Sequence, residues 1–290
     1  MKKVHADSDA RLQKGWWLAN KWLVLRRLSQ LTILMLFWSG PLWGIWIAKG
    51  NFASSTLFDV IPLSDPFIQF QSWIAGHSLH EDALLGMAII VLFYLIVGGR
   101  FFCSWVCPLN AVSDSAGWLR KRLHKYGLRS KWKPSRTTRY VVLAMALILA
   151  LALGELVWER VNPVTIFQRG LIFGLQTAWM AALTLFLWEL FVSPEGWCGR
   201  LCPHGAFYSL LNIKPLLRVN TVKRETCDDC MDCYLVCPEA QVIKPALKGV
   251  NGHGPTIDSA NCTNCGRCID ICPKEIFTFG LSIKGNPPTK

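Results

Sequence analysis

Long apolar stretches dominate the chain up to about residue 191, and a polar part rich in cysteine follows them. Four of these stretches have about the 20 residues that a helix needs to cross the hydrocarbon core of a bilayer. Residues 140–153 have no polar face to show to water, which favours membrane helices over buried helices of a large soluble core. The pattern predicts four transmembrane helices, at about Leu28–Ala48, Ala83–Phe102, Tyr140–Trp158 and Leu171–Phe191.

An internal repeat runs through this apolar part. The segment DPFIQF at residues 65–70 resembles NPVTIFQ at residues 162–168, and each is followed by an apolar stretch and a Cys-x-x-x-Cys-Pro motif. These motifs are CSWVCP at residues 103–108 and CGRLCP at residues 198–203. Two units of two helices with the same topology predict parallel repeats, related by an axis along the membrane normal. Both cysteine pairs should then lie near one another at the cytoplasmic ends of the second and fourth helices.

The polar part begins near Val219 and carries eight cysteines in two copies of the spacing C-x2-C-x2-C-x3-C-P. In bacterial two-cluster ferredoxins, three cysteines of one copy and the last cysteine of the other hold each [4Fe–4S] cluster. Structural zinc sites use two Cys-x-x-Cys pairs and have no use for the third cysteine or the Cys-Pro ending. The spacing therefore predicts one cluster on Cys227, Cys230, Cys233 and Cys272, and a second on Cys262, Cys265, Cys268 and Cys237.

These patterns predict an α-helical membrane protein, with four transmembrane helices arranged as two parallel repeats. A C-terminal α+β domain of the bacterial two-[4Fe–4S] ferredoxin type follows. The expected boundaries are a cytoplasmic N-terminal segment at 1–27, a transmembrane domain at 28–218 and a cytoplasmic ferredoxin domain at 219–290. Because short cysteine-rich loops leave little apolar core, the clusters themselves should keep this last domain folded.

Composition and charge agree with the membrane interpretation and add an orientation. Hydrophobic residues make up 52% of the chain and charged residues 17%, which is too apolar for an ordinary soluble protein. Residues 49–82 hold one lysine against four acidic residues, whereas Lys and Arg concentrate before the first helix and between the second and third. The loop between the second and third helices holds Arg120, Lys121, Arg122, Lys125, Arg129, Lys131, Lys133, Arg136 and Arg139. The positive-inside rule then predicts a multi-pass protein of the bacterial inner membrane with both termini in the cytoplasm. It also accounts for the net charge of +12, so no nucleic-acid partner is expected.

The four cysteines of the Cys-x-x-x-Cys-Pro motifs, Cys103, Cys107, Cys198 and Cys202, allow three interpretations. They could bind a further metal or cluster, act as a redox pair, or pack as inert thiols; a disulfide is disfavoured in the cytoplasm. Because proline suits the first position of a helix, Cys107 and Cys202 should be N-caps of helices that begin at Pro108 and Pro203. Such a position should lower the pKa of a thiol. The helix after Pro108 is expected to be amphipathic and to lie on the inner membrane surface.

Several stretches of the chain resemble one known family closely. They are Gly15-Trp16-Trp17, residues 22–27 (WLVLRR), residues 102–110 (FCSWVCPLN) and Cys230-Met231-Asp232-Cys233. Together with the doubled Cys-x-x-x-Cys-Pro motif and the two ferredoxin motifs, they make the chain similar to membrane ferredoxins of the NapH/MauN family over nearly its whole length. The resemblance implies the quinol-oxidising membrane component of a periplasmic nitrate reductase system. It also implies a periplasmic iron–sulfur partner of the NapG type and c-type cytochromes that feed the reductase.

A quinol site is the least defined part of this expectation. Gln69, Gln71, Gln168 and Arg169 lie in the repeated segments, which the topology places at the outer face. Their side chains could hydrogen-bond a quinone carbonyl, although such residues in loops are more often ordinary surface groups. His204 and His253 are likewise expected to be surface residues in polar loops. No nucleophile, phosphate-binding loop or haem-attachment motif is apparent.

Two other functions compete with quinol oxidation towards nitrate reductase. The chain could be an assembly or maturation factor whose clusters reduce a metal or a thiol in a partner respiratory enzyme. It could also run in the opposite direction and pass electrons from a cytoplasmic donor to quinone. Ligand spacing does not reveal where in their wide range the cluster potentials lie, so the direction of electron flow stays open.

Overall fold

The computed structural model describes residues 6–123, 132, 134–174, 176–193, 196–212 and 215–281. Within this range the chain forms two compact units. The helical unit comprises Gln30–Phe93 and Val106–Tyr208, and the cysteine-rich unit comprises the residues up to Ser29, Tyr94–Trp105 and the residues from Ser209 onward. These limits differ from the boundaries expected from composition, because residues 94–105 join the cysteine-rich unit. Lys125, Arg129, Lys131 and Lys133 of the predicted basic loop lie outside the described residues.

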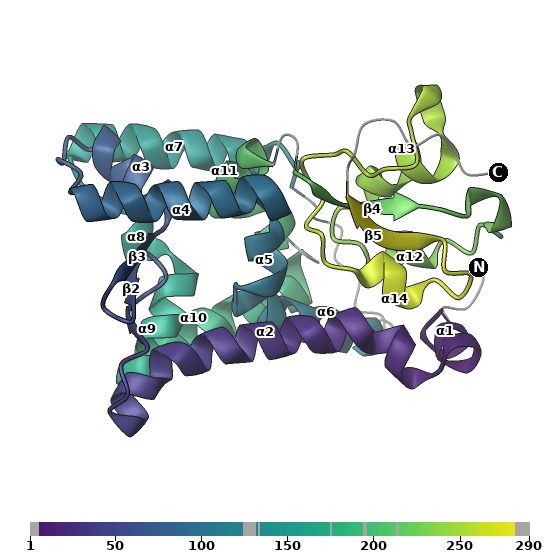
Figure 1. Ribbon diagram of the computed structural model, residues 1–290, viewed down its shortest axis with the longest axis horizontal. Coiled ribbons are helices and arrows are strands. Elements are labelled where there is room, and N and C mark those ends of the chain that lie inside the picture. The colour runs from purple at the N-terminus through teal and green to yellow at the C-terminus, as the bar shows by residue number, and fades with distance from the viewer. Residues whose placement is uncertain are drawn as a thin grey trace. The chain divides into compact units, whose positions relative to one another are not determined.

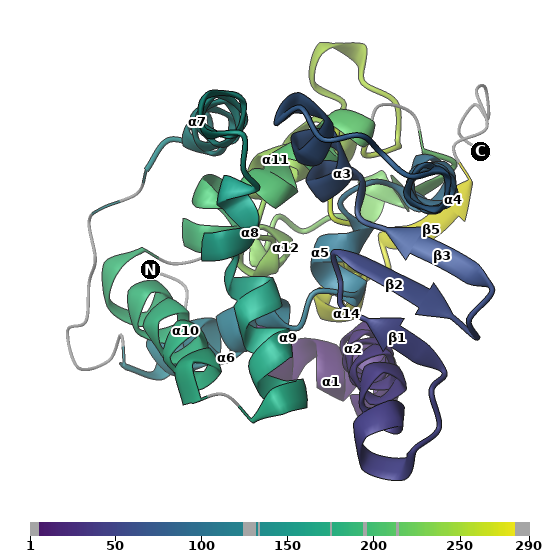
Figure 2. The same ribbon diagram turned by 90° about the vertical axis from the view of Figure 1, so that its left-hand side faces the viewer.

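The helical unit combines helices with one small antiparallel sheet (Figures 1 and 2). In the sheet β1 (Ala48–Gly50) pairs with β2 (Ser54–Leu57), which pairs with β3 (Ile61–Ser64). The helices are the C-terminal part of α2 (Trp16–Trp43), α3 (Pro66–Ile74), most of α4 (Glu81–Val97), α6 (Leu109–Leu123), α7 (Thr138–Leu153), α8 (Val157–Val161), α9 (Pro163–Phe173), α10 (Gln176–Leu187), the π-helical turns η2 (Trp188–Val192) and η3 (Trp197–Leu201), and most of α11 (Pro203–Leu211).

Helices α2, α4, α7 and α10 occupy much of the four predicted apolar stretches, but their ends differ from the prediction. The second stretch is interrupted after Val97, because Gly98 takes a left-handed conformation with φ of 106°. The fourth is interrupted between α9 and α10 by Gly174, which caps α9 with φ of 68°. Glycine adopts this region without the steric penalty of a Cβ and so commonly ends helices. In the described part of the chain, no helix combines the length and apolar character needed to cross a membrane.

The sequence repeat has a structural counterpart at the starts of α3 and α9. Asp65 caps α3 by accepting hydrogen bonds from the backbone N–H groups of Phe67 and Ile68. Asn162 caps α9 by accepting one from Val164. A proline follows each cap at the first helical position, where its missing N–H has no intrahelical partner to lose. The repeated segments, expected to be loops, are therefore helices.

The core of the helical unit is apolar and forms where four helices meet. Phe67 and Ile68 of α3 pack with Leu143 of α7, Trp158 of α8 and Ala206 of α11. α9 lies beside α10, and α10 lies beside α6 (Figure 2). This packing holds the N-terminal ends of α3 and α11 close to each other, so that His204 Nε2 lies 2.9 Å from Asp65 Oδ2.

The cysteine-rich unit is an α+β structure, as predicted for the C-terminal part. Strands β4 (Leu217–Thr221) and β5 (Phe277–Leu281) pair antiparallel, with Val219 opposite Phe279. The helices are α1 (Ala6–Lys14), the N-terminal part of α2, α5 (Phe101–Trp105), α12 (Asp232–Val236), α13 (Ile243–Lys248) and α14 (Arg267–Ile271), with 3-10 turns η4 (Arg224–Thr226), η5 (Ala240–Val242) and η6 (Val250–Gly252). In Figure 1, α13 lies on one side of the β4–β5 ribbon and α12 and α14 on the other. The buried core includes Val219, Ile243, Ile257 and Phe277.

The N-terminal segment is anchored on the second cysteine motif. The carboxylate of Asp270 accepts hydrogen bonds from the backbone N–H groups of Trp22 and Leu23, at 3.1 and 3.0 Å. Lys14 Nζ donates to the backbone carbonyl of Ile269 at 2.8 Å. The Trp22 side chain lies so close to Gly266 that a Cβ there would come within 2.6 Å of it. A glycine at position 266 therefore permits this packing.

Candidate metal centres

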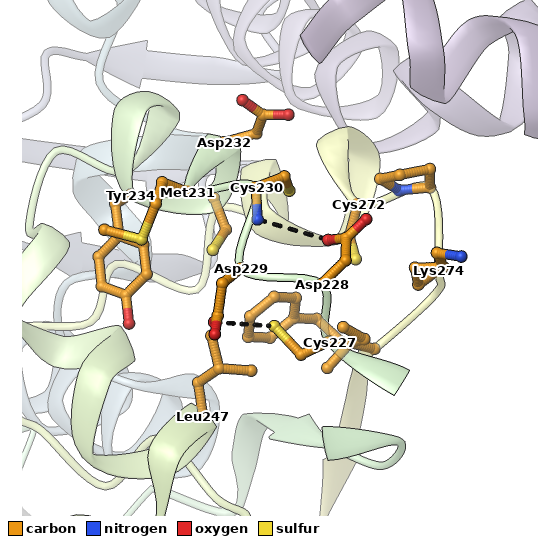
Figure 3. Close-up of a pocket in the computed structure, with 14 residues that line it drawn as sticks. Cys227, Asp228, Asp229, Cys230, Met231, Asp232, Tyr234, Leu247, Cys272 and Lys274 are labelled. Carbon is orange, nitrogen blue, oxygen red and sulfur yellow. Dashed lines mark hydrogen bonds between the residues drawn. The ribbon is translucent and has the colours of Figure 1, made fainter. Parts of the chain in front are cut away.

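Four cysteines from both motifs line one pocket of the cysteine-rich unit (Figure 3). They are Cys227, Cys230, Cys233 and Cys272, the set expected to hold the first cluster. Cys227 follows η4, Cys233 lies in α12, and Cys272 follows α14, so the last ligand comes from the other motif. The pocket contains about 390 Å³ of space not filled by protein atoms, part of it open to solvent.

The other four cysteines of the two motifs line a second pocket. Cys262, Cys265 and Cys268 meet Cys237, which follows α12, and the pocket contains about 350 Å³ of unfilled space. The structure thus brings each predicted ligand set together, including the exchange of the last cysteine between motifs. Cluster binding by these thiols is predicted from their spacing.

The loops of the two motifs bend at equivalent positions. Asp229 and Asn264, each two residues after the first cysteine of its motif, have φ of 56° and 47°. Met231 and Gly266, each four residues after it, have φ of 66° and 72°. Asn and Asp tolerate this left-handed region better than most residues, and glycine adopts it freely. The repeated turns curl both loops around their pockets in the same way.

Both pockets suit a bound group that is rich in positive charge. Burial raises the pKa of Cys233 to about 12, and the charges of neighbouring cysteines add to the rise. Burial likewise raises the pKa of Cys262 to about 11 and that of Cys268 further above its usual value. Four thiolates so placed need a bound metal group to compensate their charge, and soft sulfur donors of this kind select zinc or iron–sulfur clusters.

The ligand sets distinguish these two groups. A structural zinc site uses two Cys-x-x-Cys pairs around one ion, with all sulfurs about 2.3 Å from the metal. Each pocket instead combines three cysteines of one motif with the last cysteine of the other, which is the ligand set of a two-cluster ferredoxin.

The cysteines of the Cys-x-x-x-Cys-Pro motifs divide between the two units. Cys103 lies in α5 of the cysteine-rich unit, and the other three lie in the helical unit. Cys198 is in η3, and its Sγ lies 3.6 Å from Ser113 Oγ. Burial raises the pKa of Cys198 well above its usual value, and negative charge on Glu189, Cys107 and Cys202 acts in the same direction. These four groups are therefore close in space, and all twelve cysteines of the chain are free of disulfides.

Local structure after the two motifs follows the expectation in part. α11 begins at Pro203, directly after an extended Cys202 with φ of −65° and ψ of 113°. α6 begins at Leu109, one residue later than predicted, and buries Leu109 and Ala116 while Trp118 is exposed. The lowered pKa expected for Cys107 and Cys202 stays a prediction.

Glu189 is a residue that the sequence analysis missed. It lies in η2, within the predicted fourth transmembrane stretch, and is only 2% exposed. A single acid in an otherwise apolar stretch was the available signal, since such residues are costly there and commonly functional. Both η2 and η3 are π-helical, a conformation that occurs frequently at functional sites.

The glutamines proposed for quinone binding occupy different environments. Gln71 and Gln168 stand at the same position of the two repeats, six residues after their helix caps, and both are fully buried. Gln71 Nε2 donates to the carbonyl of Ala146 at 3.2 Å, and its Oε1 has no hydrogen-bond partner. Gln168 Oε1 accepts from the N–H of Phe52 at 2.9 Å, and its Nε2 has none. Because both partners are backbone groups of fixed polarity, the free atoms are an acceptor in one repeat and a donor in the other.

The other two candidates differ from this pair. Gln69 is only half-buried. Arg169 is half-exposed, and its Nη2 lies 3.4 Å from Glu159 Oε1. The competing interpretation, that such residues are ordinary surface groups in loops, is wrong for Gln71 and Gln168, because helices α3 and α9 turn these two side chains inward.

The expectation that His204 lies at the surface is also wrong. His204 Nε2 lies 2.9 Å from Asp65 Oδ2, to which Tyr208 donates a second hydrogen bond at 2.8 Å. Trp158 Nε1 donates to His204 Nδ1 at 3.3 Å. Since an indole can only donate, Nδ1 is the acceptor and Nε2 carries the hydrogen that is donated to Asp65. Burial opposes ionisation of Asp65, but the hydrogen bonds from His204, Ile68 and Tyr208 hold its pKa below the usual value. His253 is exposed, as expected.

Comparison with sequence families assigns iron–sulfur domains to both parts of the chain. A family described as a 4Fe-4S binding domain matches residues 79–126 and 175–220, which include the two Cys-x-x-x-Cys-Pro motifs. A family described as a 4Fe-4S dicluster domain matches residues 226–276. The second match contains the eight cysteines of both pockets.

Curated relatives resemble the chain over almost its whole length. The ferredoxin-type protein NapH of Haemophilus influenzae is 47% identical over 274 residues, which are 94% of either chain. NapH of Escherichia coli is 42% identical over 96% of either chain. The methylamine utilization ferredoxin-type protein MauN of Methylorubrum extorquens is 50% identical over 95% of this chain and 94% of its own. No solved structure matches the chain.

Proposed function

Because the chain belongs to the family of ferredoxin-type proteins that includes NapH and MauN, we propose that it oxidises membrane quinol and passes the electrons onward. It is an iron–sulfur electron-transfer protein. The proposed path leads from quinol through its iron–sulfur centres towards a periplasmic nitrate reductase. The observation that carries this proposal is the presence, in one chain, of two four-cysteine pockets and of helices whose exposed faces are apolar.

The proposed location is the bacterial inner membrane, with both termini in the cytoplasm. Soluble proteins rarely expose large contiguous apolar surfaces, and such surfaces mark membrane or protein contacts. On α7, Ile148, Leu151 and Leu153 are each more than 60% exposed. Exposed apolar side chains also occur on the other long helices: Leu31, Met35 and Leu42 on α2, Leu84, Leu85, Leu92, Phe93, Leu95 and Ile96 on α4, and Trp179, Met180, Leu183 and Leu187 on α10. Carbonate extraction of membranes tests the location, since a protein released by alkaline carbonate is not integral.

We propose that the four cysteines of the first pocket hold one [4Fe–4S] cluster and that the four cysteines of the second pocket hold another. Such a cluster, when bound, accepts and gives up one electron at a time. The chain supplies four thiolates to each cluster and buries two of each set, Cys233 and Cys272 of the first and Cys265 and Cys268 of the second. Cys230 of the first set is exposed, which leaves an edge of that pocket open to a partner.

Quinol would be recognised by the paired glutamines of the repeat. Oxidation of a quinol releases two electrons and two protons. A quinol hydroxyl can donate to Gln71 Oε1, and an oxygen of quinol or quinone can accept from Gln168 Nε2. These atoms are the two in the repeat that are buried without a partner, and each is costly to leave unpaired. Gln69 and Arg169 are weaker candidates, because the former is half-buried and the latter lies near Glu159.

The Cys-x-x-x-Cys-Pro cysteines would provide a further centre. Cys107, Cys198 and Cys202 are close in space, and the family match to a 4Fe-4S binding domain spans all four motif cysteines. The partners proposed on the resemblance are a periplasmic iron–sulfur protein of the NapG type, c-type cytochromes and the nitrate reductase.

A second function is favoured by the MauN relatives, which are as similar to the chain as the NapH relatives. Their name assigns them to methylamine utilization. The chain would then serve the biogenesis or electron supply of a methylamine-oxidising system, and an assembly role belongs to this alternative. Deletion of the gene separates the two, since loss of nitrate respiration with normal growth on methylamine supports the first and the reverse supports the second.

Metal analysis and spectroscopy test the proposed electron path. Iron and acid-labile sulfide in the protein purified in detergent should be about eight atoms each per chain if only the two-cluster domain is loaded. A higher content that is lost in a Cys103/Cys107/Cys198/Cys202→Ser variant indicates the further centre. A reduced quinol analogue should produce EPR signals of reduced clusters in the complete complex. If it reduces no centre there, quinol is not the donor.

A further inference from the structure

The two cluster motifs differ in charge although they match in spacing. The first reads CDDCMDC at residues 227–233 and contains three aspartates. The same seven positions of the second read CTNCGRC, at residues 262–268, and contain one arginine and no acid. The acid of the second motif is Asp270, which follows between Cys268 and Cys272 and is 7% exposed. Net charge, hydrogen bonding and exposure to solvent all influence the reduction potential of an iron–sulfur cluster. Two clusters in such different surroundings should not have equal potentials.

Two buried arginines flank the entry to the second motif. Arg100 is 1% exposed and donates from Nη1 to the carbonyl of Asn261 at 2.7 Å. Arg218 is 2% exposed and donates from Nη1 to the carbonyl of Ser259 at 3.0 Å. Both guanidinium groups therefore lie beside the chain segment that leads directly into Cys262. Burial raises the pKa of Cys262 to about 11, and the charges of Arg218 and Arg100 act against this rise.

The surroundings of the first motif are wetter. Asp229 forms an ion pair with Lys248, and both side chains are more than a third exposed. Cys230 and Met231 are exposed as well. Exposed charges are screened by water and salt, whereas buried charges act at short range through a medium of low dielectric constant. The buried cations of the second motif should therefore affect a nearby cluster more than the surface acids of the first motif.

Arg100 also connects the second motif with Cys103. Its guanidinium pairs with Glu239, two residues after Cys237, at 2.6 Å with both side chains 1% exposed. It lies against the thiol of Cys103 too, which is three residues away. Nearby, Trp105 Nε1 donates to the carbonyl of Asn264, whose Nδ2 donates to the carbonyl of Val97. The segment from Val97 to Trp105 is thus held against the second motif by several hydrogen bonds.

We propose that Arg100 and Arg218 hold the reduction potential of the cluster on Cys237, Cys262, Cys265 and Cys268 above that of the cluster on Cys227, Cys230, Cys233 and Cys272. The inference rests on the proposed function only in assuming that these cysteines hold [4Fe–4S] clusters. Positive charge stabilises the reduced cluster, which carries one more electron. An electron that enters the domain from a donor therefore resides on the second cluster, beside Cys103. Arg100 acts as a positioning residue that sets where the electron rests.

The test is a redox titration of the purified full-length protein with dithionite and mediators, followed by EPR. It needs no quinol, so it stays informative if the chain is not a quinol dehydrogenase. Two midpoint potentials are expected, and a Cys265→Ser variant should alter the signal with the higher one. If Cys265→Ser alters the signal with the lower midpoint instead, the proposal is overturned. Absence of iron from the protein would refute the cluster assignment itself rather than this ordering.

Charge variants distinguish electrostatic control from structural damage. Arg100→Gln should lower the higher midpoint potential by at least about 59 mV. For a one-electron couple this corresponds to a tenfold change in the equilibrium between oxidised and reduced cluster. Arg100→Lys keeps the charge and should leave most of that midpoint in place. Glu239→Gln removes the opposing charge and should shift the same midpoint upward. Structural damage would not produce opposite shifts from the two partners of one ion pair.

The matched control is Lys248→Gln, which removes a cation beside the first motif at the surface. It should leave the higher midpoint unchanged and move the lower one less than Arg100→Gln moves the higher. If Arg100→Gln fails to fold, the upward shift from Glu239→Gln decides the question alone. Equal effects of Arg100→Gln and Lys248→Gln on both midpoints, or no upward shift in Glu239→Gln, would overturn the proposal.

Discussion

In the cysteine-rich unit the chemically active side chains are of one type and recur at fixed spacing, whereas in the helical unit they are single residues of different types. Cys227, Cys230 and Cys233 lie within seven residues of one another, and their loop brings them to one pocket. Asp65 and His204 are 139 residues apart and meet only because α3 and α11 pack together. The local loop therefore brings the three cysteines of one motif together. The network of Asp65 and His204 depends instead on the packing of helices that are distant in the sequence.

The largest expected effect is on the folding of the cysteine-rich unit when iron is removed. Its core is small, centred on residues such as Val219, Ile243 and Phe277, so bound clusters should supply much of its stability. Treatment with a strong iron chelator under reducing conditions should abolish protection of amides in residues 217–281 against hydrogen exchange. Residues 138–173 of the helical unit should keep theirs. Equal loss of protection in both regions would show that the two units do not differ in this way.

The next effect concerns the buried network of the helical unit. His204→Ala removes one hydrogen-bond donor from a carboxylate whose side chain is 4% exposed, and loss of a hydrogen bond to a charged group costs about 1.5–3 kcal/mol. Thermal unfolding of the detergent-solubilised protein, followed by tryptophan fluorescence, should begin at a clearly lower temperature. His253→Ala removes an exposed histidine and serves as the control. If the two variants unfold alike, Asp65 does not depend on His204.

Replacement of the paired glutamines tests whether the repeat recognises quinol. Gln71→Leu and Gln168→Leu should each reduce quinol oxidation about tenfold or more, since a lost hydrogen bond in a buried site costs about 1–3 kcal/mol. Iron content should stay unchanged. The control is Ser72→Ala, at a half-buried position of α3 that is not among the quinone-binding candidates. A more stable protein with full activity would instead show that the two amides are simply unsatisfied groups.

The smallest expected effect is a pH dependence that comes from Glu159. Burial raises the pKa of this side chain, which is 13% exposed, while Thr165 and Arg169 act against the rise. A folded-state pKa above the unfolded value of about 4.3 contributes stability that is complete below that pH and is lost as pH rises through the folded value. Compared with Glu159→Gln, the wild-type protein should therefore become relatively less stable from about pH 4.3 upward. If the difference in free energy of unfolding between the wild-type protein and Glu159→Gln stays constant over this pH range, the pKa of Glu159 is not raised.

The cluster ligands were the most predictable part of the site. Their spacing predicted both sets, and the pockets contain the same sets, including the exchange of Cys237 and Cys272. The sequence also predicted helices in the apolar stretches and revealed the repeat, but it did not predict that Asp65 and Asn162 cap helices, since the repeated segments were expected to be loops. Helix ends were less predictable, because Gly98 and Gly174 adopt left-handed conformations that an apolar pattern does not reveal.

Burial of single polar residues could not be predicted from local patterns. Gln71 and Gln69 lie two positions apart on α3, yet only the former is fully buried. A helix turns its residues by about 100° each, so the neighbour that packs on one face decides which side chain is buried. The same reason applies to His204, whose polar neighbours in the sequence predict a surface position but which helix packing buries.

The sequence by itself determined the cysteine spacing, the repeat and the contrast in charge between the two cluster motifs. Those features depend on residues a few positions apart, whose relative placement follows from local backbone geometry. Only the tertiary structure decided that Arg100 and Arg218 lie beside the second motif, and that Asp65, His204 and Tyr208 form one network. Such contacts join residues more than 30 positions apart, and packing of whole helices and strands is what brings their charges together.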